Sequence, residues 1–253
     1  MTDIQLFSYP TSPYAQKVAC YLKYKQLDFK FIGVNPMSST EIAFTRQRQV
    51  PVMQVGDEWR KESSELGIWL DELYPERPIL PNDKQSRDDI LLIDQWISNS
   101  LIPSVFRYAV EWQNAWYSIT NGWRLSRAVS NATPLPLYVR ILWPWGVKRA
   151  AFIVNMVEKM DLTESIPDMN KRLQDEFLKH LAGGPFLGNQ ANITLADLSA
   201  FPIITNGHFM GMKTKQSLKE HPEILAWAKR VYAELPMNPT LVPDKLLRHH
   251  NLE

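Results

Sequence analysis

Short runs in which apolar and polar residues alternate dominate the first third of the chain and predict β-strands. Stretches whose apolar residues recur every three or four positions separate these runs and predict helices. The expected strands cover residues 4–9, 28–34, 50–55 and 58–61, and the expected helices cover residues 13–25, 39–47 and 62–74. This order, which ends in a hairpin and a helix, is typical of an α/β layer with a mixed sheet.

A proline-rich segment at residues 75–83 has the composition of a linker, and after it the apolar residues recur at helical spacing. Residues 86–116 carry apolar side chains at helical intervals, and we expect Pro103 to kink or divide that helix. Beyond the linker the pattern predicts no paired strands. We therefore predict two domains, an α/β domain at residues 1–82 and an all-helical domain at residues 83–253.

One apolar segment, residues 135–147, has the sequence LPLYVRILWPWGV. It is too short to cross a bilayer, and Pro136, Arg140 and Pro144 interrupt it. We expect it to be buried or to lie at an interface within the protein. Peripheral contact with a membrane surface is the alternative.

Composition narrows the class of protein. The 253 residues carry a net charge of +1, so nothing in the overall charge indicates a nucleic-acid partner or an anionic membrane. A single cysteine, Cys20, excludes an intramolecular disulfide and a cysteine-rich metal site. His249 and His250 have no further metal-ligating residues nearby in the sequence, and we expect no metal site. The N-terminus lacks the basic start and apolar core of a signal peptide, so we expect a cytoplasmic protein.

The start of the first expected helix is a candidate site. Ser12 can cap this helix, and Pro13 takes the first helical position, where its missing N–H costs nothing. A polar side chain at such a place meets unpaired backbone N–H groups and the positive end of the helix dipole, which suits an anion or a thiolate. The alternative is a well-capped helix without chemistry.

Two further motifs carry possible ligand contacts. Pro51 opens an expected strand and lacks a donor for the sheet, so it needs a special position; a cis bond before it would leave the backbone of Val50 free to pair with an extended peptide. Glu62 and Ser63 stand at the start of the third expected helix. They can cap that helix, or they can grip the ammonium and carboxylate of an amino-acid ligand.

Tryptophan and tyrosine are concentrated in residues 112–145. Packing in the core and between the domains is one explanation, and the wall of a hydrophobic pocket facing Ser12 is the other, since ligand sites favour domain interfaces. For such a pocket we single out Tyr14, Tyr108, Trp112 and Trp116.

Thr194 and Asp197 have the spacing of a capping box at the start of an apolar helix, with aspartate in place of glutamate. We assign both residues to structure and not to catalysis.

The motifs at residues 12–15, 50–52 and 62–70, in this order after a first strand, resemble the cytosolic glutathione transferase superfamily. The segment SPYAQKV is similar to the Cys-Pro-Phe-Ala segment of the omega class, with serine in place of cysteine. The runs VNPMSSTEI and VPVM are similar to prostaglandin E synthase type 2 and its bacterial relatives, in which Cys-Pro-x-Cys occupies the same site.

The resemblance implies a thioredoxin-like N-terminal domain, an all-α C-terminal domain and a homodimer. It implies that glutathione lies extended along Val50 beside a cis Pro51, with its γ-glutamyl end held by Glu62 and Ser63. The thiolate would lie at Ser12, which acts as a hydrogen-bond donor, and would be conjugated to a hydrophobic electrophile. The alternatives for the donor are the neighbouring hydroxyls: Ser8, Tyr9 and Thr11.

The sequence departs from the omega-like pattern at the sulfur end of this site. Ser12 and Ala15 stand where the relatives have cysteines, so mixed-disulfide chemistry is not available there, and we expect neither thiol transfer nor prostaglandin synthase activity. We expect Cys20 to be a buried apolar residue. The alternative to an enzyme is a catalytically silent member that binds a hydrophobic ligand, such as haem, or serves in assembly.

Overall fold

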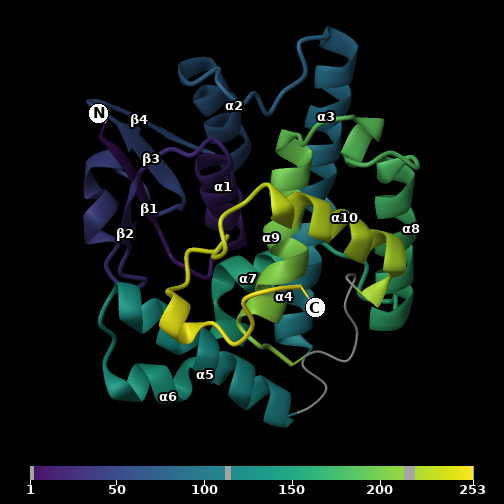
Figure 1. Cartoon of the computed structure of the whole chain (residues 1–253). Coiled ribbons are helices and arrows are strands. Elements are labelled where there is room, and N and C mark those ends of the chain that lie inside the picture. The colour runs from purple at the N-terminus through teal and green to yellow at the C-terminus, as the bar shows by residue number, and fades with distance from the viewer. Residues whose placement is uncertain (1–2, 112–114, 214–219, 253) are drawn as a thin grey trace.

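Four short strands form a mixed sheet in the order β2-β1-β3-β4 (Figure 1). The computed structural model describes residues 3–111, 115–213 and 220–252. β1 pairs in parallel with β2, whereas β3 is antiparallel to both β1 and β4. Their bounds are Ile4–Ser8 (β1), Lys30–Gly33 (β2), Val52–Val55 (β3) and Glu58–Lys61 (β4). The parallel pair needs a crossover, which helix α1 (Pro13–Tyr24) provides.

The two faces of the sheet belong to different apolar clusters because neighbouring side chains on a strand point to opposite faces. Leu6 and Met53 join the main core together with α1 and α2 (Ser63–Leu73). Phe7 and Val52 face the other way and form a smaller cluster with Ile42 of the 3₁₀ segment η1 (Thr40–Thr45). A helix was expected at residues 39–47, and the structure has this shorter segment instead, because Ser39 adopts a left-handed conformation and does not cap it.

Beyond the sheet and α2, the described chain consists of helices joined by loops. The helices are α3 (Lys84–Trp96), α4 (Ile102–Val110), α5 (Ala115–Ala132), α6 (Leu137–Gly146), α7 (Ala151–Val157), α8 (Ile166–Leu181), α9 (Leu195–Phe209) and α10 (Pro222–Ala233). Short 3₁₀ segments are η3 (Val147–Arg149), η4 (Leu187–Asn189) and η6 (Asp244–Leu246). The predicted fold class, an α/β domain followed by an all-α domain, is confirmed. The predicted boundary at residue 82 falls between α2 and α3.

A π-helical turn, η2 (Ile97–Leu101), lies between α3 and α4. Pro103 follows at the second position of α4. A proline has no N–H to give to the carbonyl one turn earlier, and a π-turn is one way for a helix to absorb that lost bond. The expected division of this helix at Pro103 is therefore present, and it takes the form of a widened turn.

The two parts share one continuous core. α1 packs against α9, and the main cluster runs from the sheet through both helices. Gly67 of α2 lies close to this contact: a Cβ added there would be 2.7 Å from Leu195 and 2.9 Å from the Tyr21 ring. In Figure 1, α1 and α2 lie between the sheet and the helical bundle. Ligand contacts contributed by α1 and α2 would thus be adjacent to the junction of the two parts.

The segment at residues 135–147 differs from its expectation. It was expected to be buried or to lie at an interface within the protein, but most of it forms the exposed helix α6, in which only Pro144 is buried. Its outer side chains are among the most exposed large apolar residues of the described chain. The reason is that, within the described residues, α6 packs mainly on α5, through Gly122 and Pro144, which leaves its outer side uncovered. No helix of the described chain is long and apolar enough to cross a membrane.

Candidate functional site

The strand register brings three predicted motifs to one edge of the sheet. Phe7 of β1 pairs with Val52 of β3, and Val52 pairs in turn with Lys61 of β4. The segment after β1, the segment before β3 and the segment after β4 therefore meet at the same edge. These segments contain, respectively, Ser12, Val50–Pro51 and Glu62–Ser63.

Ser12 is the N-cap of α1, and Pro13 is the first residue of the helix, as the sequence predicted. The Ser12 Oγ accepts a hydrogen bond of 3.4 Å from the backbone N–H of Ala15. This long bond uses one acceptor position and leaves the hydroxyl proton free to be donated. The side chain is partly exposed, so an incoming group can reach it.

The Val50–Pro51 peptide bond is cis, which is the form that the resemblance implies. Val50 is half-buried and packs against the smaller cluster together with Tyr9. Within the described part of the chain, no hydrogen bond involves the Val50 backbone N–H or C=O. These groups are available to an extended ligand strand at the start of β3.

Glu62 has φ 66° and ψ 108°, an unusual conformation for a residue other than glycine. Such conformations cost about 1–3 kcal/mol and are concentrated at functional sites. Glu62 occupies the N-cap position of α2, yet its side chain makes no cap hydrogen bond. The N–H groups in the first turn of α2 thus lack the side-chain acceptor that a usual N-cap supplies. The adjacent Ser63 is buried.

Tyr14 lies at the start of α1, where it packs against the main core. It is the second residue of α1, and its pKa is raised to about 12, first by burial and then by the negative charge of Glu62. The Tyr14 hydroxyl stays protonated at neutral pH and remains a hydrogen-bond donor.

A buried ionic cluster lies directly behind this site, and no sequence motif indicates it. Lys17 Nζ is 2.8 Å from Asp94 Oδ1 and donates to Ser98 Oγ at 3.0 Å and to Ser64 Oγ at 3.4 Å. Asp94 also accepts from the hydroxyls of Ser64 and Ser199. The cluster links α1 and α2 to α3, η2 and α9. A lysine and an aspartate 77 positions apart leave no local pattern, so only the tertiary structure reveals the pair.

The alternative hydroxyls differ in their surroundings. Ser8 is fully buried, and its Oγ has no hydrogen-bond partner within the described residues. The ring of Tyr9 packs on the opposite face of the sheet from α1, and burial raises the pKa of its hydroxyl while a hydrogen bond with Ser39 lowers it. Thr11 is partly exposed, next to Ser12. Ser12 is the hydroxyl that caps α1, and it is reachable from solvent.

Cys20 is fully buried on α1. Burial raises the pKa of its thiol to about 12, although the positive charge of Lys23 lowers it. Its Sγ lies 3.8 Å from the carbonyl oxygen of Pro239 in the C-terminal segment, which covers this side of α1. A protonated and covered thiol does not act as a nucleophile.

The residues chosen for a hydrophobic pocket are dispersed. Tyr108 lies on α4 and packs against the main core, where burial raises its pKa. Trp116, at the start of α5, is 62% exposed. Trp112 lies outside the described residues. Two shallow cavities, of about 320 and 290 Å³, lie over α8 and beside α10, and neither Tyr108 nor Trp116 lines them. The pocket therefore remains a prediction.

Thr194 and Asp197 form a capping box at the start of α9. The buried Asp197 carboxylate accepts from the backbone N–H and hydroxyl of Thr194 at 2.8 and 2.7 Å, and from the backbone N–H of Leu187 at 2.9 Å. A fourth bond, 2.7 Å, comes from Trp227 Nε1 on α10. Every donor is part of the scaffold, so the cluster organises helices and presents no group to a ligand.

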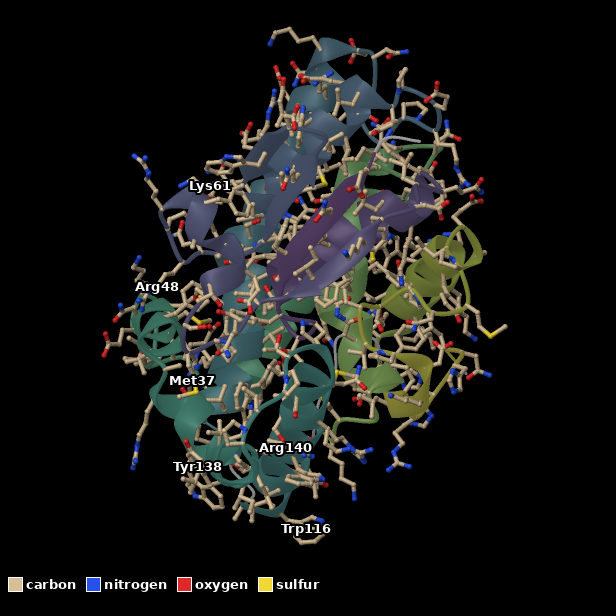
Figure 2. All side chains as sticks on the ribbon, turned by 90° about the vertical axis from the view of Figure 1, so that its left-hand side faces the viewer. Met37, Arg48, Lys61, Trp116, Tyr138 and Arg140 are labelled. Carbon is tan, nitrogen blue, oxygen red and sulfur yellow. The ribbon has the colours of Figure 1, made fainter. Side chains whose placement is uncertain are left out.

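The electrostatics of the candidate site favour an anionic, extended ligand. The N-termini of α1 and α2 each direct positive dipole ends to the same edge of the sheet. Arg48 and Lys61 are exposed next to this edge and project from the same side of the molecule (Figure 2). A ligand with a carboxylate and a thiolate would meet these two ends.

Comparison with known proteins agrees with this geometry. The family model described as "Glutathione S-transferase, N-terminal domain" matches residues 6–78. Prostaglandin E synthase 2 of Mus musculus is 38% identical over 57 residues, which are 22% of this chain and 15% of that protein. Glutathione S-transferase Z1 of Arabidopsis thaliana is 33% identical over 89 residues, which are 33% of this chain and 40% of that protein. The matched stretches thus span less than half the length of these curated relatives.

The likeness in fold extends over nearly the whole chain. A solved structure of human glutathione transferase theta-2, in complex with glutathione and an unknown ligand, has a TM-score of 0.61 to this chain at 21% identity. The match covers 92% of this chain and 82% of that one. At this level of identity the similarity shows the fold, and the chemistry has to be argued from the site.

Proposed function

Because the chain belongs to the cytosolic glutathione transferase superfamily, we propose that it is a glutathione-dependent transferase that joins the glutathione thiolate to a hydrophobic electrophile. One observation carries the proposal. The start of α1, the Val50–Pro51 segment and the uncapped start of α2 all lie at the same edge of the sheet. Each motif alone has a structural explanation, but their convergence supports a single ligand site.

Glutathione is an extended tripeptide with two carboxylates, an ammonium group and a central thiol, and its backbone, its γ-glutamyl end and its thiol each have a partner here. The cysteinyl backbone would pair with the free N–H and C=O of Val50. The γ-glutamyl carboxylate would bind Ser63 and the first N–H groups of α2, while its ammonium would meet the Glu62 carboxylate. This arrangement directs the thiol toward Ser12.

The Ser12 hydroxyl is proposed as the donor that stabilises the thiolate. A free thiol with a pKa near 8.5 is mostly protonated at neutral pH. A hydrogen bond from Ser12 and the field at the start of α1 both favour the ionised form, and each unit of pKa is worth about 1.4 kcal/mol. The proton passes to solvent, the thiolate forms a carbon–sulfur bond, and the leaving group departs with the electron pair of the broken bond.

Disulfide exchange is not proposed for this site. Such exchange needs a protein thiolate that attacks a sulfur atom. Ser12 supplies an oxygen in that place, and Cys20 is covered, with a pKa raised to about 12. Conjugation requires only the thiolate of glutathione itself, so it is the reaction compatible with these residues.

Retention on immobilised glutathione, followed by a conjugation assay with a chlorinated nitrobenzene, tests the proposal. We expect the wild type to be retained and active. We expect Ser12→Ala to be retained, because Ser12 does not hold the peptide ends, but to lose about tenfold in turnover at neutral pH, which corresponds to one unit of thiol pKa. Ser8→Ala and Thr11→Val serve as matched controls that remove the neighbouring hydroxyls.

Three outcomes would change the proposal. Unchanged turnover in Ser12→Ala with loss in Thr11→Val or Ser8→Ala would move the donor to that residue. Retention without turnover would favour a glutathione-binding protein without transferase activity. No retention and no turnover would favour the catalytically silent alternative. The homodimer is part of the same proposal, and sedimentation of the purified chain tests it.

A further inference from the structure

An exposed apolar face covers one end of the helical part. On α6, Leu137, Tyr138, Ile141, Leu142 and Trp145 are each more than half exposed. Trp116 of α5 and Phe152 of α7 are exposed to a similar extent. We refer to these seven residues as the α5–α7 face. In both views α5 and α6 form the lower end of the molecule, and Figure 2 shows Trp116 and Tyr138 there at its surface.

The exposure follows from helix geometry. Positions 137, 138, 141, 142 and 145 recur with the spacing of one helical side, so α6 presents a continuous apolar stripe. The inner side of α6 is held close to α5, since a Cβ on Gly122 would come within 2.7 Å of Pro144. Soluble monomers rarely expose contiguous apolar patches of this kind without an interaction partner.

All the charged residues in this region of the sequence are basic. Residues 115–157 contain five basic residues and no aspartate or glutamate. The whole chain has 28 lysines and arginines and 27 aspartates and glutamates. Outside residues 115–157 there are therefore 23 basic and 27 acidic residues, and that part of the chain is net negative. The five are Arg124, Arg127, Arg140, Lys148 and Arg149. Arg127 and Arg149 are exposed, and Arg140 lies over the Trp123 ring with its Cζ 5.0 Å from the centroid.

We propose that the α5–α7 face binds the surface of an anionic lipid bilayer, with α6 lying in the plane of the membrane. Exposed aromatic and aliphatic side chains flanked by arginines are the combination that inserts at the headgroup boundary of such a surface. At ten residues α6 can lie on a bilayer but cannot cross it.

The one-sided charge argues against a second copy of the chain as the occupant. A two-fold contact through this face would bring the same basic residues together from both copies without an acidic partner. An anionic bilayer offers both an apolar interior and the opposite charge. The proposal does not depend on the glutathione site, because none of the residues assigned to that site lies on this face except the untested Trp116.

Co-sedimentation of the full chain with vesicles tests the inference. We expect binding to vesicles that contain phosphatidylserine, weaker binding to pure phosphatidylcholine, and a loss of the difference as salt is raised. Leu142→Glu should lower the partition coefficient by about tenfold or more. Leu92→Glu is the matched control, since Leu92 on α3 is a leucine of nearly equal exposure, 62% against 58%. It should bind as the wild type does.

A second variant tests whether the exposed arginines contribute to vesicle binding. Arg127→Gln/Arg149→Gln should weaken binding to phosphatidylserine vesicles and leave the residual binding to phosphatidylcholine unchanged. Circular dichroism and melting temperatures check that each variant is folded. Failure of the wild type to bind anionic vesicles, or equal losses in Leu142→Glu and Leu92→Glu, would overturn the proposal. A self-association that Leu142→Glu abolishes, without vesicle binding by the wild type, would show that a second copy is the occupant.

Discussion

Ser12 and Asp197 both cap helices, and the difference in their surroundings separates a candidate for chemistry from a residue of the scaffold. Ser12 makes one bond of 3.4 Å at a partly exposed helix start. Asp197 is fully buried and accepts four bonds of 2.7–2.9 Å from three elements. A loosely engaged hydroxyl can turn to a ligand, whereas a carboxylate with four scaffold donors cannot.

The stability contributed by Asp197 should depend on pH. Burial raises the pKa of its carboxyl to about 6, even though all four hydrogen bonds lower it. In the unfolded chain an aspartate titrates near 3.9, so between about pH 4 and 6 the folded state binds more protons than the unfolded state. The stability that this group provides is therefore greatest below that window and falls as pH rises through it.

Asp197→Ala supplies the reference for this measurement. At pH 7 we expect it to lower the free energy of unfolding by about 1–3 kcal/mol, since it leaves several buried donors without an acceptor. The deficit relative to wild type, measured by chemical denaturation, should be larger at pH 4 than at pH 7. A deficit that grows with pH instead would mean that the four donors outweigh burial. An unchanged unfolding free energy would remove the structural assignment itself.

At the scale of elements, the close contact of α1, α2 and α9 positions the site. Gly67 permits this approach, because a methyl group there would clash with Leu195 and with the Tyr21 ring. Gly146, at the end of α6, has open space around its Cβ position. Both glycines lie in helices, so they form a matched pair.

Gly67→Ala should destabilise the protein by about 1–3 kcal/mol, through overpacking at the helix contact. Gly146→Ala should leave stability unchanged or raise it by up to about 1 kcal/mol, because alanine is the better helix former. Melting curves of both variants check the pair. Equal effects in the two variants would mean that helix propensity alone decides, and that the contact is not tightly packed.

The Lys17–Asp94 pair is the polar counterpart of that contact. Both side chains are at most 2% exposed, and their atoms are 2.8 Å apart. Lys17→Met should lower the free energy of unfolding by about 3–5 kcal/mol, because it leaves the buried charge of Asp94 without its partner. In the double variant Lys17→Met/Asp94→Leu, the loss of unfolding free energy, measured by chemical denaturation, should be clearly smaller than the sum of the losses in the two single variants. Additive costs would show that the two residues act independently.

The sequence predicted those elements whose pattern lies within a few neighbouring residues. Ser12, Pro13 and the spacing of Thr194 to Asp197 are local patterns, and the structure has the helix starts that they predict. The conformation of Glu62 is not visible in sequence, because glutamate has no preference for positive φ.

For the whole molecule, tertiary contacts decided what the local pattern could not. The apolar run of α6 is equally typical of a buried helix and of an exposed interfacial one, and only the number of neighbours distinguishes them. The pairing of Lys17 with Asp94 likewise depends on how α1 meets α3. By contrast, the mixed sheet followed by helices was predictable, since strand and helix periods differ and each is repeated several times.

The function proposed for the whole molecule requires glutathione to bind across three segments with its thiol at Ser12. The most direct measurement is the titration of the bound thiol, followed by the ultraviolet absorption of the thiolate in the complex, for the wild type and for Ser12→Ala. In the wild type we expect the pKa of the bound thiol to lie at least about one unit below its free value near 8.5, and in Ser12→Ala we expect it to return toward that value. A complex whose thiol titrates at the same pKa in both proteins, or a wild type that binds no glutathione, would contradict the proposed function.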